Sequence, residues 1–214
     1  MTGEMAISLS SGAVLVGLGA FHGVNPGMGW LFAVALGMQE HRRSAVWRAL
    51  LPLAMGHAFA IAAAVAVAVL VGAIIPMHSL RWAVAAFLVA LGVARLIRHR
   101  HPRWVGMRVG IGGLTVWSFL MASAHGAGLM VVPVFLAMGH ESNQAACHAI
   151  AASTPTAALL ATFLHAAGYL LITAAVAVLV FEKLGVKILR KAWFNIDLVW
   201  VATLIATGVI TTLI

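Results

Sequence analysis

Charge is the property this sequence has least of. Asp, Glu, Lys and Arg together make up 8% of the 214 residues, whereas hydrophobic residues make up 63%. A soluble domain carries roughly 25% charged residues, so this chain has too few charges to cover a water-facing surface. Its apolar runs have the length that spans a bilayer, about 20 residues. The composition therefore excludes a soluble globular domain and predicts an all-α polytopic membrane protein.

Cysteine and acidic residues are scarce as well. The single cysteine, Cys147, excludes an intrachain disulfide and any multi-cysteine metal site. The chain has 13 Lys and Arg against 5 Asp and Glu, but its basic residues do not form a nucleic-acid patch. All except Arg81 fall in three clusters: Arg42, Arg43 and Arg48; Arg95, Arg98, Arg100, Arg103 and Arg108; Lys183, Lys187, Arg190 and Lys191. This spacing indicates the positive-inside pattern of a membrane protein and no nucleic-acid partner.

Six apolar segments are predicted to cross the bilayer. They cover residues 10–38, 50–75, 82–97, 111–138, 155–181 and 192–214. The basic clusters lie in alternate connections, which places those connections in the cytoplasm and both termini outside. We expect residues 1–214 to form a single transmembrane domain in a bacterial plasma (inner) membrane, surrounded by lipid. No nucleotide-binding loop of the Walker type occurs, and the sequence leaves a homo-oligomer open.

The two halves of the chain, about 10–97 and 111–214, share traces of a repeat. "FHGVNPGMG" in the first segment matches "AHGAGLMVVP" in the fourth, since each has a His-Gly pair followed by Met and Pro. "LAMGHAFAIAAAVAVAV" in the second matches "ATFLHAAGYLLITAAVAV" in the fifth. Three segments per half make the second half run opposite to the first. We therefore predict six transmembrane helices as a 3+3 inverted repeat.

Four histidines are predicted at membrane depth: His22, His57, His125 and His165. An ionisable group there is costly and by default faces the bundle interior or a wet cavity. Each imidazole could simply bridge two helices by hydrogen bonds, worth on the order of 1 kcal/mol. Their positions in the repeat favour a shared site instead, and neutral imidazole is the commonest metal ligand, suited to Zn, Cu, Fe and Ni.

Prolines interrupt the first and fourth segments. Pro26 removes the hydrogen bond to the carbonyl of His22, and Pro133 removes the bond to the carbonyl of Leu129. We expect helices 1 and 4 to be interrupted or kinked there, with Asn25 and the freed carbonyls lining a polar cavity. Paired discontinuous helices in two inverted halves are typical of a transporter binding site. A plain proline kink is the alternative.

Other candidate groups are fewer. Met28 and Met121 are soft ligands that would favour Cu(I), or they are ordinary apolar filler. Asp197 is the only carboxylate predicted to enter the membrane. It either pairs with a basic residue such as Lys191 at the interface or acts as a proton-coupling acid beside the pathway.

Residues 22–28, His-Gly-Val-Asn-Pro-Gly-Met, resemble the first-helix motif His-x-x-x-Pro-Gly-His of the nickel/cobalt efflux permeases, which belong to the lysine-exporter superfamily. The segment Met55-Gly-His57-Ala resembles the next motif of that family. The resemblance covers mainly residues 1–75. It implies six transmembrane helices and transition-metal export, with His22 and His57 handling the metal. Met28 replaces the family's second histidine, and the family's long histidine-rich loop is missing, which puts nickel in doubt.

We therefore expect a secondary transporter that exports a transition-metal cation of the Ni, Co, Cu or Zn class through a midplane histidine site. The metal would be a substrate or ligand, and no fixed cofactor is predicted. One alternative is export of amino acids or other small organic solutes. Others are an intramembrane zinc hydrolase that combines Ser123 and His125 with His22, His57 and Asp197, as three histidine ligands and an acid, or an accessory membrane subunit without transport.

Overall fold

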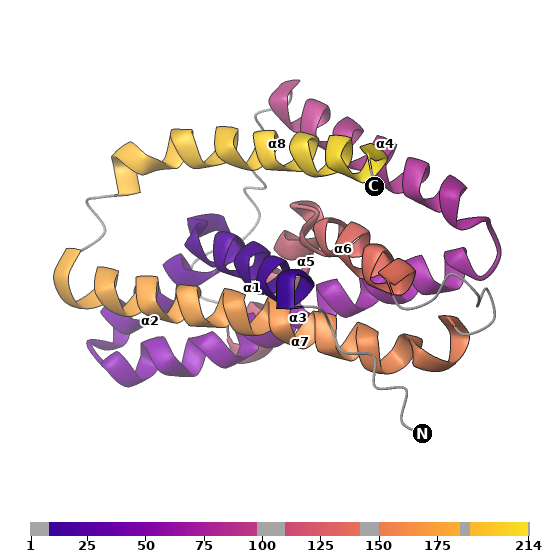
Figure 1. Cartoon of the computed structure of the whole chain (residues 1–214). Coiled ribbons are helices and arrows are strands. Elements are labelled where there is room, and N and C mark those ends of the chain that lie inside the picture. The colour runs from indigo at the N-terminus through magenta and orange to yellow at the C-terminus, as the bar shows by residue number, and fades with distance from the viewer. Residues whose placement is uncertain (1–8, 98–109, 142–149, 185–188, 214) are drawn as a thin grey trace.

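The computed structural model describes residues 9–97, 110–141, 150–184 and 189–213, and in these ranges every regular element is helical. The all-α prediction is thus confirmed for this part of the chain (Figure 1). The elements are α1 (Leu9–Val24), the short 3-10 helix η1 (Pro26–Met28), α2 (Trp30–Glu40), α3 (Arg43–Gly72), α4 (Met77–Ile97), α5 (Ile111–Ala124), α6 (Ala127–Glu141), α7 (Ile150–Leu179), the π-helical turn η2 (Val180–Leu184) and α8 (Leu189–Leu213).

Several helices are long and apolar enough to cross a membrane. Three qualify alone, Arg43–Gly72, His78–Ile97 and Pro155–Lys183. A fourth qualifies if Gly112–Ala124 and Ala127–Ala137, bent by 63° at their junction, count as one span. Ser10–Val24 and Leu198–Leu213 are shorter apolar helices. These lengths are consistent with a membrane protein, while the number six stays a prediction.

The long helices begin earlier than the apolar runs suggested. α3 starts at Arg43 instead of residue 50, and α7 starts at Ile150 instead of residue 155, so Pro52 and Pro155 lie inside helices. α4 begins directly after Pro76 and not at residue 82. Apolar runs mark only the part of a helix that meets hydrocarbon. Each of these helices continues for a further turn or more through polar and small residues.

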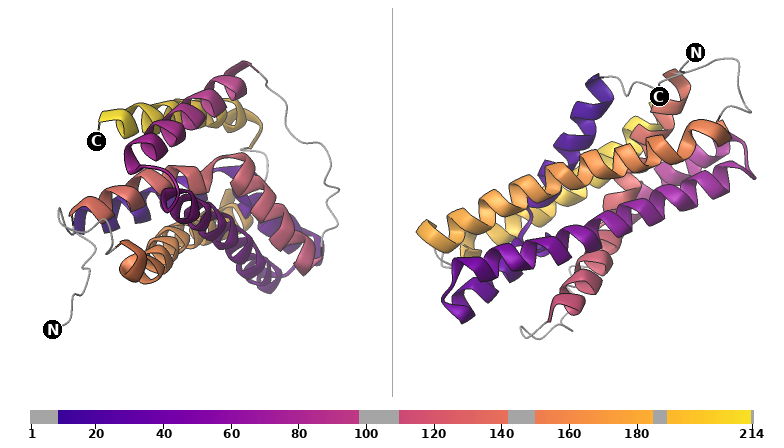
Figure 2. Two further views of the ribbon diagram at one scale, coloured as in Figure 1. Left: turned by 90° about the vertical axis from the view of Figure 1, so that its right-hand side faces the viewer. Right: turned by 90° about the horizontal axis from the view of Figure 1, so that it is seen from below.

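The helices associate in three main pairs. α1 packs against α7, α3 against α5, and α4 against α8. α3 and α7 also contact each other, and α4 and α8 lie together along one side of the remaining helices (Figures 1 and 2). Each of the three pairs takes one helix from residues 10–97 and one from residues 111–214. The two halves of the chain are therefore interleaved rather than packed as separate bodies.

Glycine allows the closest of these approaches. A Cβ atom on Gly19 of α1 would lie 2.0 Å from the carbonyl oxygen of His165, and one on Gly168 of α7 would lie 2.3 Å from that of Val16. On the α3–α5 pair, a Cβ on Gly56 would lie 2.1 Å from the carbonyl oxygen of Thr115. No side chain fits at such separations, so these glycines bring the backbones of paired helices into direct contact.

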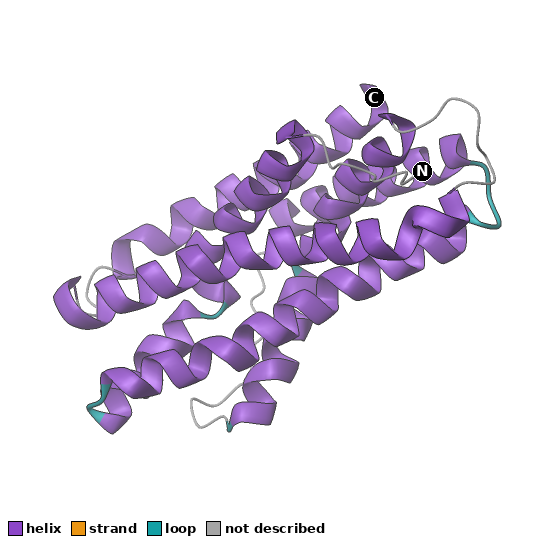
Figure 3. Ribbon diagram, turned by 60° about the horizontal axis from the view of Figure 1, so that its bottom comes forward, coloured by secondary structure: helices purple, strands orange, loops and turns teal. Residues whose placement is uncertain are grey.

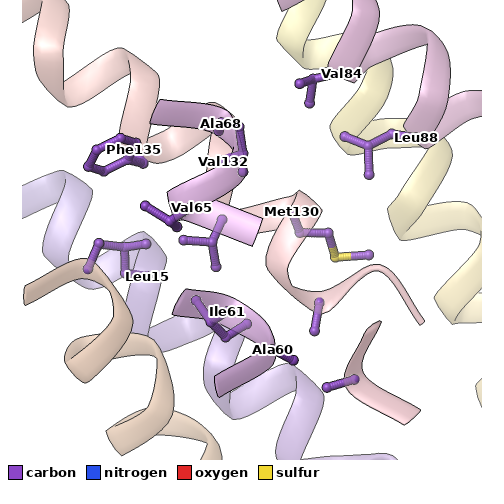
Figure 4. Packing of buried hydrophobic residues seen from close by; sticks show 14 of the residues in the cluster. Leu15, Ala60, Ile61, Val65, Ala68, Val84, Leu88, Met130, Val132 and Phe135 are labelled. Atoms are coloured by element: carbon purple, nitrogen blue, oxygen red, sulfur yellow. The ribbon is translucent and has the colours of Figure 1, made fainter. Parts of the chain in front are cut away.

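Two apolar clusters fill the interior. The larger one joins α1, α3, α4, α6 and α7, and Figure 4 shows part of it, including Leu15, Ile61, Val65, Met130 and Phe135. The second packs α2 against the start of α3 and the end of α7: Trp30, Ala33, Val34, Val46, Ala49, Leu50, Leu53, Leu114, Ala177 and Val180. His57 lies on α3 between Leu53 of the second cluster and Ala60 of the larger cluster. The boundary between the clusters is where polar groups enter the interior.

The predicted interruptions of the first and fourth segments are both present, one of them at another residue. The first segment is broken between α1 and α2 at residues 25–29, as Pro26 predicted. The fourth is broken at His125 and Gly126, between α5 and α6, whereas Pro133 lies inside α6. Gly126 has φ +73, a left-handed conformation that ends a helix. At both breaks the two half-helices are joined by a short segment (Figure 3).

Candidate functional site: a buried cluster of three histidines

Three of the four predicted histidines meet in the interior. His22 lies in the last turn of α1, His57 in α3 and His165 in α7, and all three are 0% exposed. Their ring centroids are 4.9 Å apart for His22 and His165, 5.4 Å for His57 and His165, and 5.6 Å for His22 and His57. We call these residues the three-histidine cluster. The structure thus brings together side chains that are 143 residues apart in the chain.

Most ring nitrogens of the cluster lack a protein partner. The Nδ1–H of His22 donates to the carbonyl of Leu18 at 2.6 Å, which leaves its Nε2 buried and unbonded. Both ring nitrogens of His57 and of His165 are buried without a hydrogen-bond partner, although the Leu15 carbonyl faces the His165 ring. Buried polar groups are nearly always hydrogen-bonded, to protein or to water. Unsatisfied nitrogens from three helices at one point therefore indicate a place for a water molecule or a ligand.

Tyr169 covers one side of the cluster. Its ring stacks on His57 with centroids 3.9 Å apart and an interplanar angle of 7°. Its hydroxyl donates to the carbonyl of Met28 at 2.5 Å and also lies against the hydroxyls of Ser118 and Thr173. The sequence reasoning missed this residue. A signal was present, since Tyr169 is the only tyrosine of the chain and follows His165 by one helical turn.

Trp200 of α8 covers another side and connects His125 to the cluster. Its ring lies 4.5 Å from that of His22 and 5.5 Å from that of His125, edge to face in both cases. Its Nε1–H donates to the carbonyl of His125 at 3.0 Å. The Nδ1–H of His125 donates to the carbonyl of Met121 at 2.8 Å. The described contacts therefore reach His125 through Trp200, and His125 stands beside the three-histidine cluster.

The break between α1 and α2 is closed by its own side chains. Asn25 is the N-cap of η1, and its Oδ1 accepts from the backbone N–H of Gly27 at 2.8 Å. The Nε1–H of Trp30 donates to the carbonyl of Val24 at 2.9 Å. The carbonyl of His22, which Pro26 was expected to free, accepts from the backbone N–H of Asn25 at 3.2 Å. These two carbonyls therefore each already accept a hydrogen bond within the protein, and the polar cavity stays a prediction.

Asn25 retains one candidate contact for a ligand. Its Nδ2 is buried without a hydrogen-bond partner, and the residue is 4% exposed. Its Oδ1, the atom that could coordinate a cation, is used for capping. The role of Asn25 in binding stays a prediction, with its amide N–H group as the donor that has no partner.

The two methionines occupy different surroundings. Met28 is buried in the larger apolar cluster, and its backbone carbonyl accepts from Tyr169. Met121 is half-buried, with its Cε 3.9 Å from where a Cβ of Gly27 would lie. Within the described residues, no three His, Cys, Asp or Glu side chains are placed to hold a metal ion as they stand. Ligation by the cluster would require its rings to turn.

Asp197 and Ser123 are the remaining predicted candidates. Asp197 lies in α8, three residues before Trp200, but its side chain is outside the described part of the structure. Ser123 is exposed while His125 is buried. These two residues, which the hydrolase alternative combined, therefore face different surroundings.

Comparisons with models of known families, with curated proteins and with solved structures find no match to this chain. The resemblance to the nickel/cobalt efflux permeases thus rests on the motif residues around His22 and His57 alone.

Proposed function

We propose that this chain is a secondary transporter whose substrate site is the three-histidine cluster and whose substrate is a transition-metal cation. The spacing of the three rings carries the proposal. Imidazoles bound to one ion through nitrogen at about 2.1 Å, with tetrahedral or trigonal angles, have ring centres about 5 to 5.5 Å apart. The observed separations are 4.9, 5.4 and 5.6 Å. Rotation of the rings would direct three nitrogens to one ion.

The arrangement of the helices supports a transporter. We propose six spans in a 3+3 inverted repeat, because α1 with α7 and α3 with α5 are the pairs that exchange under such a repeat. Each half contributes to the cluster, and each half contains a broken helix next to a histidine. Interrupted helices at corresponding points of two halves are typical of substrate sites in secondary transporters. Access to the cluster would then alternate through movement of the half-helices that lie beyond the two breaks.

An ion pair supports the proposed orientation. Arg43 at the start of α3 lies 3.0 Å from Glu182 in η2, so the start of α3 and the end of α7, each next to basic residues, are on the same side of the molecule. This is the side that the positive-inside pattern assigns to the cytoplasm. Export as the direction, and a bacterial plasma membrane as the location, follow from the resemblance of residues 22–28 to efflux permeases.

A small organic solute is the second candidate substrate. The rings of Tyr169 and Trp200 flank the cluster on two sides, and aromatic faces with a few polar groups are typical of small-molecule sites. In this case the imidazole N–H groups would bind the solute or relay protons. A protein that transports the solute and binds no metal would favour this candidate.

Metal binding by the purified protein tests the proposal. The protein is loaded in detergent with Ni²⁺, Co²⁺, Zn²⁺ or Cu⁺, dialysed, and its metal content measured by mass spectrometry. We expect about one ion per chain for at least one cation, and a loss of affinity of at least about 100-fold in His57→Ala. His78→Ala is the matched control, because His78 is exposed on α4 and bonds to Trp82. No bound ion under any loading would refute the metal proposal.

A further inference from the structure

Tyr169 contacts two parts of the proposed transporter, the three-histidine cluster and the break between α1 and α2. Its ring lies on His57, and its hydroxyl holds the carbonyl of Met28, 141 residues earlier in the chain. It is 0% exposed, so both contacts are shielded from water. Met28 is the last residue of η1, immediately before the turn into α2. Tyr169 therefore contacts the substrate site with one end and the helix break with the other.

The backbone at Gly29 passes close to the hydroxyl of Tyr169. Gly29 follows Met28 with φ +132, a conformation that residues with a side chain rarely adopt. A Cβ there would lie 3.1 Å from the Oη of Tyr169 and 2.9 Å from Cδ2 of Leu53. The chain thus passes directly over the hydroxyl, in a conformation that only glycine adopts at low cost.

We propose that Tyr169 is a positioning residue that couples occupancy of the three-histidine cluster to opening of the break between α1 and α2. The inference rests on the proposed function. The described side chains do not hold an ion as they stand, so binding requires a ring to turn. His57 is the ring of the three that no described hydrogen bond holds in place, and we take it as the one that turns. Its ring is stacked on that of Tyr169 with centroids 3.9 Å apart, and interiors are too closely packed for one ring to turn alone. Tyr169 then moves with His57.

Movement of Tyr169 acts on the break through its hydroxyl. The bond to Met28 weakens when the ring shifts, and the Met28 carbonyl loses the donor that satisfies it in the interior. α2, which begins at Trp30 and packs on α3 and α7, is then released from α7 at its first turn. Binding of the ion on one side of Tyr169 thus favours opening on the other, as alternating access requires.

Tyr169→Phe separates the two ends of this connection. The variant keeps the ring that stacks on His57 and removes only the hydroxyl. The cation is the one that the wild-type protein binds among Ni²⁺, Co²⁺, Zn²⁺ and Cu⁺. Equilibrium affinity for that ion, transport into proteoliposomes, and hydrogen exchange of the backbone amides of residues 25–32 are measured with and without the ion.

We expect the affinity of Tyr169→Phe to stay within about threefold of wild type while transport falls at least fivefold. In the wild type, adding the ion should raise exchange of residues 25–32. In the variant, exchange there should be about fivefold faster than in the ion-free wild type and insensitive to the ion, because the hydrogen bond is already absent. A general loss of stability would instead raise exchange throughout α1 and α7.

Thr173→Val is the matched control, because Thr173 lies against the same hydroxyl and belongs to neither the three-histidine cluster nor the break. It should leave both the ion response and transport unchanged. Equal transport and an equal ion-dependent exchange in Tyr169→Phe and wild type would overturn the coupling while leaving the metal site intact. If wild-type protein binds no cation, the proposed function and this inference fail together.

Discussion

The two helix breaks differ in how each is made and in what holds it. The first spans residues 25–29 and contains a 3-10 turn with Pro26 at its start and Asn25 as its cap. The second is a turn at His125 and Gly126 with no proline. Carbonyls at the first break accept hydrogen bonds from Trp30 of the adjoining helix and from Tyr169 of α7. Carbonyls at the second break accept hydrogen bonds from α4 and α8.

Those donors come from the α4–α8 pair. Arg95 donates to the carbonyl of Ala124 at 2.6 Å, and the indole N–H of Trp200 donates to that of His125. A Cβ on Gly126 would meet Leu91 of α4 and Leu204 of α8. The second break is thus held by α4 and α8, and the first mainly by α7 and its own residues. Each half therefore contains a broken helix whose carbonyls accept hydrogen bonds from side chains, but the neighbouring helices that contact the break differ between the halves.

The largest expected difference concerns the histidines beside the two breaks. His22→Ala removes a member of the three-histidine cluster and should lower metal affinity at least about 100-fold. His125→Ala should lower it less than about fivefold, because His125 reaches the cluster through Trp200. Isothermal titration of both variants with the bound cation measures this ratio. Equal losses would place His125 among the ligands.

Replacement of the glycine at each break by alanine should lower the free energy of unfolding by different amounts. Gly29→Ala is expected to cost about 3 kcal/mol, since φ +132 lies outside the regions open to alanine and the methyl group meets Leu53. Gly126→Ala, at φ +73, should cost about 1 to 2 kcal/mol. Thermal unfolding in detergent measures both.

Gly17→Ala is the control for these two variants, because nothing lies within 4 Å of the added methyl group on α1. It should gain about 0.5 to 1 kcal/mol from the better helix propensity of alanine. A larger cost at Gly126 than at Gly29 would contradict the comparison.

Removal of the indole donor at either break should lower the free energy of unfolding by a similar amount, but the two substitutions should differ in their effect on metal affinity. Trp30→Phe removes the donor to the part-buried carbonyl of Val24, and Trp200→Phe removes the donor to the buried carbonyl of His125; each should cost about 1 to 2 kcal/mol. Only Trp200 contacts His22, so only Trp200→Phe should weaken metal binding, by severalfold. The same titration and unfolding measurements distinguish them. An equal effect of Trp30→Phe on binding would mean that the first break itself shapes the site.

Prolines should have the smallest effects. Pro133→Ala should change stability by less than about 1 kcal/mol, because α6 continues through it and the break lies at Gly126. Pro26→Ala should cost about 0.5 to 1 kcal/mol through the greater freedom of the unfolded chain. Unfolding in detergent again measures both, and a straight helix across residues 25–29 in Pro26→Ala would show that the proline alone makes the break.

The sequence predicted the features that depend on composition and repetition. The helical fold, the interruption at Pro26 and the meeting of His22, His57 and His165 followed from apolar runs and matched motifs. It mislocated the second break, because Pro133 is a strong local signal while the conformation of Gly126 depends on α4 and α8. Position along a helix does not tell which way a side chain faces, so His125 could not be separated from the others.

Tyr169 and Trp200 were not predicted as site residues from the sequence, for a related reason. In a chain with 63% hydrophobic residues, an aromatic side chain stands out little, and its role depends on contacts with distant segments. The polar atoms of these two residues reach carbonyls 141 and 75 residues away. Such partners are known only once the helices are placed.

The direct backbone contact of α1 with α7 limits how the molecule can change shape. A methyl group on Gly19 or Gly168 would overlap the opposite backbone at 2.0 and 2.3 Å, so the two helices touch through their backbones here, and the larger side chains next to each glycine oppose sliding of one helix along the other. α1 and α7 therefore form a fixed pivot that carries His22 and His165 together. In the proposed transporter, the movement that admits and releases the substrate would then fall to α2 and α6, the two half-helices that lie beyond the breaks.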